Sequence, residues 1–266
     1  MSLYIKSQCS GLFECAIDYT PIFFLILVVR YLLISGGAFL IFWILLRRNI
    51  EHKRIQENYP KRRTVLNEIK WSILTFTIFG GIGSMVVWAS HNGYTKVYRN
   101  FDEYGIAYFI LSIVLFMILH DAYFYFSHRL MHTKFLFKKV HKVHHLSNNP
   151  TPWASFSFHP SEAVLEAGIL PVFAFLFPYH PLALFVSLLI MSVMNALGHL
   201  GYEFYPKGFT KHLIGKWFNT STHHNMHHSK VNCNYGLYFN WWDRIFQTNH
   251  SLYHETFEEV TSNQNS

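Results

Sequence analysis

Residues 21–46 read PIFFLILVVRYLLISGGAFLIFWILL, an apolar run of 26 residues in which Arg30 is the one charged side chain. A helix needs about 20 apolar residues to cross the hydrocarbon core of a bilayer, so this run is long enough to span a membrane. Two further apolar runs follow at residues 71–89 and at about 104–126. The sequence therefore predicts an all-α integral membrane bundle with about three spanning helices.

A fourth apolar segment, residues 162–200, is interrupted by Pro178 and Pro181. Prolines so placed mark a turn, and the piece before them is short for a span, so we expect a helical hairpin that does not fully cross. The predicted organisation is an N-terminal transmembrane region at 1–126 and a histidine-rich region at 127–256 that includes the hairpin. A polar tail at 257–266 follows.

The composition supports a membrane protein and gives its orientation. Hydrophobic residues make up 51% of the chain and charged residues 14%, against about 25% charged residues in an ordinary soluble domain. The formal charge is +7, but eight of the 22 Lys and Arg residues fall in 47–70, directly after an apolar run. This pattern indicates a positive-inside loop rather than a nucleic-acid surface. Lys6 is the only Lys or Arg residue before the first apolar run, so the basic side of this span is loop 47–70. We therefore expect this loop and both histidine-rich segments, 127–160 and 201–266, on the cytoplasmic side.

The cysteines and the N-terminus give weaker signals. Cys9, Cys15 and Cys233 contain no CxxC pair, and we expect no disulfide framework. The first residues lack the pattern of a cleavable signal peptide. Nothing in the sequence indicates an oligomeric state.

Three clusters of histidines follow the apolar runs at spacings typical of one helical turn. On a helix, residues three or four positions apart lie on one face, and two imidazoles one turn apart can bind one metal ion. Eight nitrogen ligands are too many for one ion and about right for two. The clusters therefore predict a paired metal site at the membrane surface, with imidazole-binding metals such as Fe, Zn or Cu. The ligands predicted from spacing are His128, His132, His141, His144, His145, His224, His227 and His228.

Three stretches carry a resemblance: HDAYFYFSHRLMH, HKVHHLSNNPTPWASFSFHPSE and STHHNMHHSKVNCNYGLYFNWWDRIF. They resemble the fatty acid hydroxylase/sterol desaturase superfamily over about residues 121–246, with HxxxH, HxxHH and HHxxHH in that family's order. The resemblance implies a non-haem di-iron centre that uses O2 to hydroxylate or desaturate a lipid. It adds His199 and His223 as further metal ligands.

The resemblance also directs attention to side chains around the ligands. Asn195 stands where some family members have another histidine, so a direct ligand is replaced by a water-mediated contact or lost. Asp121 is expected to orient a ligand imidazole. His120 is expected to be a buried, hydrogen-bonded residue rather than a ligand. Further expectations are that His159 and Glu162 support the site and that Asp243 and Arg244 form an internal ion pair.

The function predicted from these residues is O2-dependent oxidation of a sterol-like or fatty-acyl membrane lipid. The chain has no haem-binding HPGG and no flavin or nicotinamide motif, so electrons are expected from a separate cytochrome b5-like or ferredoxin-like protein. The alternatives are a zinc-dependent membrane hydrolase and a metal-binding membrane protein that use the same histidines. The hydrolase is disfavoured because no carboxylate stands beside a cluster as it does in HExxH.

Overall fold

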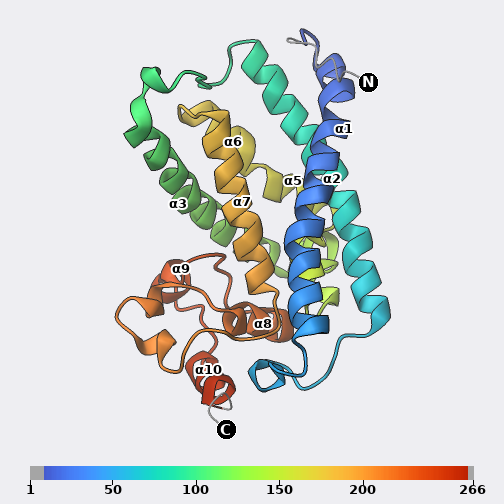
Figure 1. The fold of residues 1–266 in the computed structure, drawn as a ribbon, viewed down its shortest axis with the longest axis vertical. Coiled ribbons are helices and arrows are strands. Elements are labelled where there is room, and N and C mark those ends of the chain that lie inside the picture. Colours follow the sequence, from blue (N-terminus) through green and yellow to red (C-terminus); the bar gives the residue numbers. More distant parts are fainter. Residues whose placement is uncertain (1–8, 263–266) are drawn as a thin grey trace.

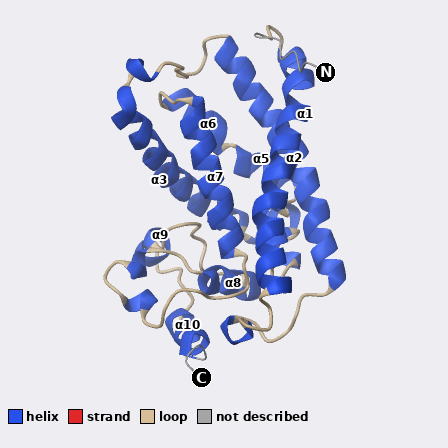
Figure 2. Ribbon diagram, viewed as in Figure 1, coloured by secondary structure: helices blue, strands red, loops and turns tan. Residues whose placement is uncertain are grey.

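The computed structural model describes residues 9–262, so the expectations that involve Lys6 and residues 263–266 lie outside it. Within this range the chain is helical, and its extended segments form isolated bridges rather than strands (Figure 2). The predicted all-α fold is confirmed. Four helical segments are long and apolar enough to cross a membrane: Leu12–Leu45, Arg62–His91, Gly105–Met131 and Pro181–Gly198.

The first two spans are longer than the sequence predicted. The first consists of α1 (Leu12–Tyr31) and the π-helical turns Leu32–Gly36 and Phe39–Leu45. The second, α2, covers Arg62–His91, so the predicted basic loop 47–70 ends at residue 61. The length of the apolar runs did not predict the ends of these two helices, because a helix can continue through polar and basic residues beyond the hydrocarbon core.

α1 and α2 pack closely because α2 carries glycines at the contact, as its sequence indicated. A Cβ atom at Gly80 would lie 3.0 Å from the backbone oxygen of Thr20, and one at Gly83 would lie 3.1 Å from the Phe23 ring. Small residues allow this approach, which is typical of helix pairs in membranes.

The third span is α3 (Gly105–Met131), and the predicted hairpin follows further along the chain. Its first limb consists of two short helices, α5 (Pro160–Ala167) and α6 (Ile169–Leu176). Its second limb, α7 (Pro181–Gly198), begins at Pro181 and is long enough to cross. The prediction of a hairpin with a short first limb is confirmed, whereas α7 is longer than a partial crossing requires.

The remaining helices gather at one end of the bundle, where the C-terminus also lies (Figure 1). These helices are α4 (Lys134–Leu136), α8 (Ser221–Lys230), α9 (Trp241–Ile245) and α10 (Tyr253–Ser262). Phe257 on α10 is fully buried and packs with Tyr253 and Met226, so residues 257–262 belong to the folded body rather than to a tail.

A buried aromatic cluster connects the spans to this end of the molecule. Tyr31 of α1 packs edge-to-face on Phe76 of α2 and on Trp153, and its hydroxyl donates to the Trp153 carbonyl at 2.6 Å. Trp153 belongs to the 3-10 segment Pro152–Phe156, which follows the second histidine cluster. This packing fixes the histidine-bearing loop against the end of α1 and the middle of α2.

The expectation that no cysteines pair is wrong for the N-terminal two. Cys9 and Cys15 form a disulfide at the start of α1, and Cys233 is free and buried. The chain turns into the helix between the two cysteines, which brings positions six residues apart within disulfide reach. This disulfide lies near His91, at the end of α2 away from the histidine clusters.

Candidate metal centre

Nine histidines gather in two groups, each with ring nitrogens within 4.8 Å of one another. The groups adjoin each other: the rings of His145 and His228 lie 5.1 Å apart. Eighteen histidines occur in the chain, and nine of them are concentrated here. The first histidine group is His128, His132, His141, His145 and His227, and the second histidine group is His144, His199, His224 and His228.

Only the first cluster of the sequence stays together in one group. His128 lies on the last turn of α3 and His132 caps it, one helical turn further on. The second cluster lies on a π-helical turn followed by a 3-10 turn, and His144 belongs to the second group while His141 and His145 belong to the first. The interpretation that each cluster presents a single helical face is therefore wrong for this segment.

The third cluster is also divided, although it lies on one helix. On α8, His224 and His228 are one turn apart and enter the second group, and His227 enters the first. α8 begins with the Thr220 hydroxyl accepting from the His223 amide at 3.1 Å. His199, at the end of α7, completes the second group from a distant part of the chain.

Backbone carbonyls determine which ring nitrogen faces the centre of each group. Nδ1 of His128 donates to the Tyr235 carbonyl at 2.9 Å, that of His227 to the Cys233 carbonyl at 2.6 Å, and that of His199 to the Asn195 carbonyl at 2.8 Å. A neutral imidazole carries one N–H, so the Nε2 atoms of these three rings present lone pairs. Lone pairs that converge on one point are the arrangement that a metal cation binds.

The second group has the dimensions of a metal site. The Nε2 atoms of His199, His224 and His228 lie 3.0, 3.2 and 3.2 Å apart. A point equidistant from all three lies about 1.8 Å from each, slightly less than the roughly 2.0–2.1 Å of a zinc–imidazole bond. These three atoms could hold one metal ion, and His144 Nε2, 3.5 Å from His199 Nε2, is a fourth donor.

The first group has a similar but more open arrangement. Nε2 of His128 lies 3.0 Å from Nε2 of His141, and Nε2 of His132 lies 3.2 Å from Nε2 of His145. Nε2 of His227 is buried without a hydrogen-bond partner. Five nitrogen donors around one point fit a transition-metal ion with imidazole ligands.

Burial keeps these imidazoles neutral, which is the form that binds a metal. Removal from water, together with nearby imidazoles, lowers the pKa of His145 to about 3 and that of His199 to about 4. The pKa values of His224 and His227 are also well below the ordinary value, for the same two reasons. The donor set is thus ready for metal without losing protons first.

Three predicted site residues occupy other positions. His223 lies outside both groups, with Nε2 3.4 Å from an Asp243 carboxylate oxygen. Asp121 accepts from the backbone amides of Tyr238 and Phe239 rather than contacting a ligand imidazole. The Asn195 amide donates to the Ser155 carbonyl, and its backbone oxygen holds His199.

Other expectations for neighbouring residues have mixed outcomes. His120 is a buried histidine hydrogen-bonded to the Tyr238 hydroxyl at 2.8 Å, as predicted. Glu162 supports the site, because its carboxylate lies 2.7 Å from Nδ1 of His141. The prediction of an Asp243–Arg244 ion pair is wrong, because the two side chains have other partners. Asp243 accepts from the amides of residues 235 and 236, whereas Arg244 donates to the Lys216 carbonyl.

The sequence reasoning missed the loop that holds the first group. The carbonyls of Cys233 and Tyr235 both accept from ligand imidazoles, and the Tyr235 ring lies 5.1 Å from the His132 ring. Backbone carbonyls carry no residue-type signal, so only the NYG stretch at 234–236, already part of the resemblance, pointed to this loop.

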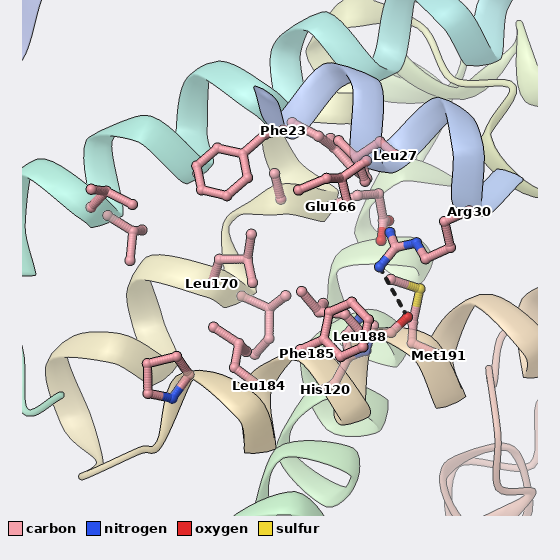
Figure 3. A pocket seen from close by; sticks show the side chains of 18 of the residues that line it. Phe23, Leu27, Arg30, His120, Glu166, Leu170, Leu184, Phe185, Leu188 and Met191 are labelled. Carbon is pink, nitrogen blue, oxygen red and sulfur yellow. Dashed lines mark hydrogen bonds between the residues drawn. The ribbon is translucent and has the colours of Figure 1, made fainter. Parts of the chain in front are cut away.

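An apolar cavity of about 500 Å³ lies among α1, α2, α3 and the hairpin (Figure 3). Its lining includes Phe124, whose ring lies 4.8 Å from His128, and Phe158, whose ring lies 5.3 Å from His144. Asn195 also lines it. The cavity therefore ends one layer of side chains away from both histidine groups.

Comparison with known proteins gives a consistent result. The sequence profile of the family described as fatty acid hydroxylase matches residues 113–248, which include every histidine of both groups. A Delta(7)-sterol 5(6)-desaturase of Gibberella zeae is 30% identical over 219 residues, covering 81% of this chain and 64% of that protein. A lathosterol oxidase of Homo sapiens is 29% identical over 201 residues, covering 74% of this chain and 63% of that protein.

The chain thus spans somewhat less than two thirds of the length of these two relatives. A Delta(7)-sterol 5(6)-desaturase of Schizosaccharomyces pombe is 31% identical over 157 residues, 59% of this chain and 50% of that protein. No solved structure matches.

Proposed function

Because the chain belongs to the fatty acid hydroxylase family, we propose that it is an O2-dependent oxidase that desaturates or hydroxylates a C–H position of a sterol-like membrane lipid. The observation that carries this proposal is the pair of buried histidine groups at the inner end of an apolar cavity. The relatives named above act on sterols by their printed names, which favours a sterol over an acyl chain.

The residues fit two iron ions, and iron bound there would supply the reduction of O2 and the removal of hydrogen from an unactivated C–H bond. The first and second histidine groups would each hold one ion. The carbonyls of Tyr235, Cys233 and Asn195 fix the ring orientation of their histidines. Glu162 does the same for His141, and such supporting hydrogen bonds raise the basicity of a ligand.

Desaturation removes two hydrogens from the lipid, and with two electrons, two protons and O2 it yields an alkene and two waters. Hydroxylation consumes the same two electrons and two protons, yielding an alcohol and one water. The electrons come from a separate carrier protein. Exposed lysines at 138, 139 and 142 adjoin His141 and provide a basic surface for an acidic carrier.

The site is proposed to face the cytoplasm. The basic segment 47–61 joins α1 to α2 at the same end of the bundle as α8 and α10 (Figure 1). Positively charged loops favour the cytoplasmic side. The Cys9–Cys15 disulfide lies near His91, at the other end of α2, and disulfides persist in oxidising compartments.

The test is lipid analysis of cells with and without the gene, under air and under low oxygen. We expect a sterol product that lacks two hydrogens or carries one added oxygen, formed only in air. Cells that express His227→Ala at a normal protein level should lack this product. A product that forms equally without oxygen, or a hydrolysed lipid, would contradict the proposed oxidation.

A further inference from the structure

Glu166 is a buried carboxylic acid without a partner. It lies on α5, is 8% exposed, and makes no hydrogen bond or ion pair with any residue in the described part of the chain. Its side chain lines the apolar cavity (Figure 3). An ionisable side chain placed at membrane depth is costly, and an unpaired polar group in an apolar surrounding costs further free energy. A ligand that supplies a hydrogen bond would remove this cost.

Three other polar side chains that line the cavity make hydrogen bonds within the protein. His120 is hydrogen-bonded to Tyr238, and the Asn195 amide donates to the Ser155 carbonyl. Arg30 reaches from α1 and donates to the Leu188 carbonyl at 3.3 Å, so it spans from α1 to α7 across the cavity (Figure 3). Glu166 differs from these three side chains, because it makes no hydrogen bond within the described part of the chain and its carboxyl group is left to a bound lipid.

The charges around the cavity select among lipid polar groups. Arg30 lines it as well as Glu166, so the apolar wall carries one cationic and one acidic side chain. A carboxylate or phosphate group would bring a like charge to Glu166, and an ammonium group would bring a like charge to the Arg30 guanidinium. A hydroxyl is uncharged and can donate a hydrogen bond to a carboxyl oxygen. The cavity is therefore suited to a lipid whose buried polar group is a neutral hydroxyl.

On the premise of the proposed function, we propose that Glu166 determines specificity by accepting a hydrogen bond from the hydroxyl of an alcohol lipid, which enters the cavity hydroxyl end first. The lipid class is a hydroxysterol or a similarly long alcohol. Glu166 lies one turn beyond Glu162, the residue that holds His141. A hydroxyl held at Glu166 therefore places the oxidised carbon near the hydroxyl-bearing end of the lipid.

The cavity has an opening and a length that suit such a lipid. Ile26 of α1 and Phe185 of α7 both line it, and their side chains are 44% and 49% exposed, so the cavity is not closed between these two helices. A lipid can therefore enter from the bilayer between these helices. The lining of α1 extends from Tyr19 to Arg30 and that of α7 from Pro181 to Asn195, which is roughly 16 to 21 Å at 1.5 Å per residue.

The experiment measures binding by purified, zinc-loaded full-length protein, which does not turn over. The probes are a Δ7 3β-hydroxysterol and its 3-methyl ether, and a long-chain alkanol and its methyl ether. The wild-type protein should bind at least one alcohol about 10-fold more tightly than its ether, because the ether cannot donate. Glu166→Leu should reduce this ratio to about one while keeping its affinity for the ether.

Matched variants make the result specific. Glu166→Gln, which still accepts a hydrogen bond, should keep most of the preference, and Glu255→Gln, at an exposed position of α10, should keep all of it. Glu166→Ala is measured in parallel in case the leucine variant does not fold. An unchanged alcohol preference in Glu166→Ala or Glu166→Leu, or no preference in the wild-type protein, would overturn the role of Glu166. Neither result would contradict the proposed oxidation, because that activity is measured separately as product in cells.

Discussion

Whether a ring nitrogen of a histidine faces one of the two histidine groups depends on what the other ring nitrogen contacts. His227 and His223 lie on the same helix, four residues apart. The His227 Nδ1 donates to the Cys233 carbonyl, which leaves Nε2 directed into the first histidine group. The His223 Nε2 instead faces the Asp243 carboxylate, which also holds the loop at 235–236. Substituting each of these two residues in turn therefore tests metal binding by one histidine against structural support by the other.

We expect His227→Gln and His223→Gln to differ in metal content. His227→Gln removes a donor from the first group and should reduce binding from about two metal ions per chain to about one. His223→Gln should keep about two ions but unfold at a lower temperature, because a buried partner of Asp243 is lost, at a cost of roughly 1–3 kcal/mol. Elemental analysis and thermal unfolding of iron-loaded protein measure the two effects.

An exposed histidine provides the control for this comparison. His52 lies in the segment between α1 and α2 and is exposed, so His52→Gln should change neither quantity. Loss of one metal ion in His223→Gln would show that it is a ligand, as the resemblance implied. Two retained ions in His227→Gln would argue against the paired site.

At the scale of elements, the histidine groups depend on short helices that are not spans. α8 supplies His224, His227 and His228, and α10 packs beneath it through Phe257. A helix of ten residues is marginal alone, so its position comes from such packing. The C-terminal helix therefore belongs to the support of the metal centre.

Phe257→Ala should destabilise the protein by about 3–5 kcal/mol, because it leaves a cavity in a fully buried contact. Metal content should fall as α8 loses its packing. Glu259→Ala, an exposed change on the same helix, should alter neither the unfolding temperature nor the metal content. If Phe257→Ala unfolds like the wild-type protein, the end of the chain is the dispensable tail that its polar composition predicted.

At the scale of the whole molecule, the bundle has two chemically different ends. One end holds the basic segment 47–61 and the histidine groups, and the other holds the Cys9–Cys15 disulfide and the loop at 92–100. The cavity lies between these ends and opens to the side. The lipid substrate and the separate electron carrier that we propose would thus approach the site from different directions.

Single cysteines at exposed positions should reveal this asymmetry. Glu57→Cys and Lys142→Cys should react with an impermeant thiol reagent from the cytoplasmic side, and Lys96→Cys from the opposite side. The parent protein, whose Cys233 is buried and whose other cysteines are paired, should show little background reaction. Labelling of positions 57 and 142 from opposite sides would contradict the assembly of one site from segments that share a side.

The sequence by itself determined the helical membrane fold and the concentration of histidines that form the candidate metal centre. The length of apolar runs and the spacing of histidines are local properties, so they can be interpreted without knowledge of tertiary contacts. They were least reliable at boundaries: α2 begins at Arg62, before the apolar run, and α10 continues past residue 256. The Cys9–Cys15 pairing was also missed, because it depends on how the chain turns into α1.

Only the tertiary structure decided how the ligands divide between two groups. His144 and His145 are adjacent in sequence but enter different groups, as His227 and His228 do on α8, because adjacent side chains of a helical turn point about 100° apart or more. His199 meets His144 although 55 residues separate them. The direction of each imidazole depends on carbonyls such as those of Asn195 and Tyr235, which chain folding alone brings into hydrogen-bonding distance.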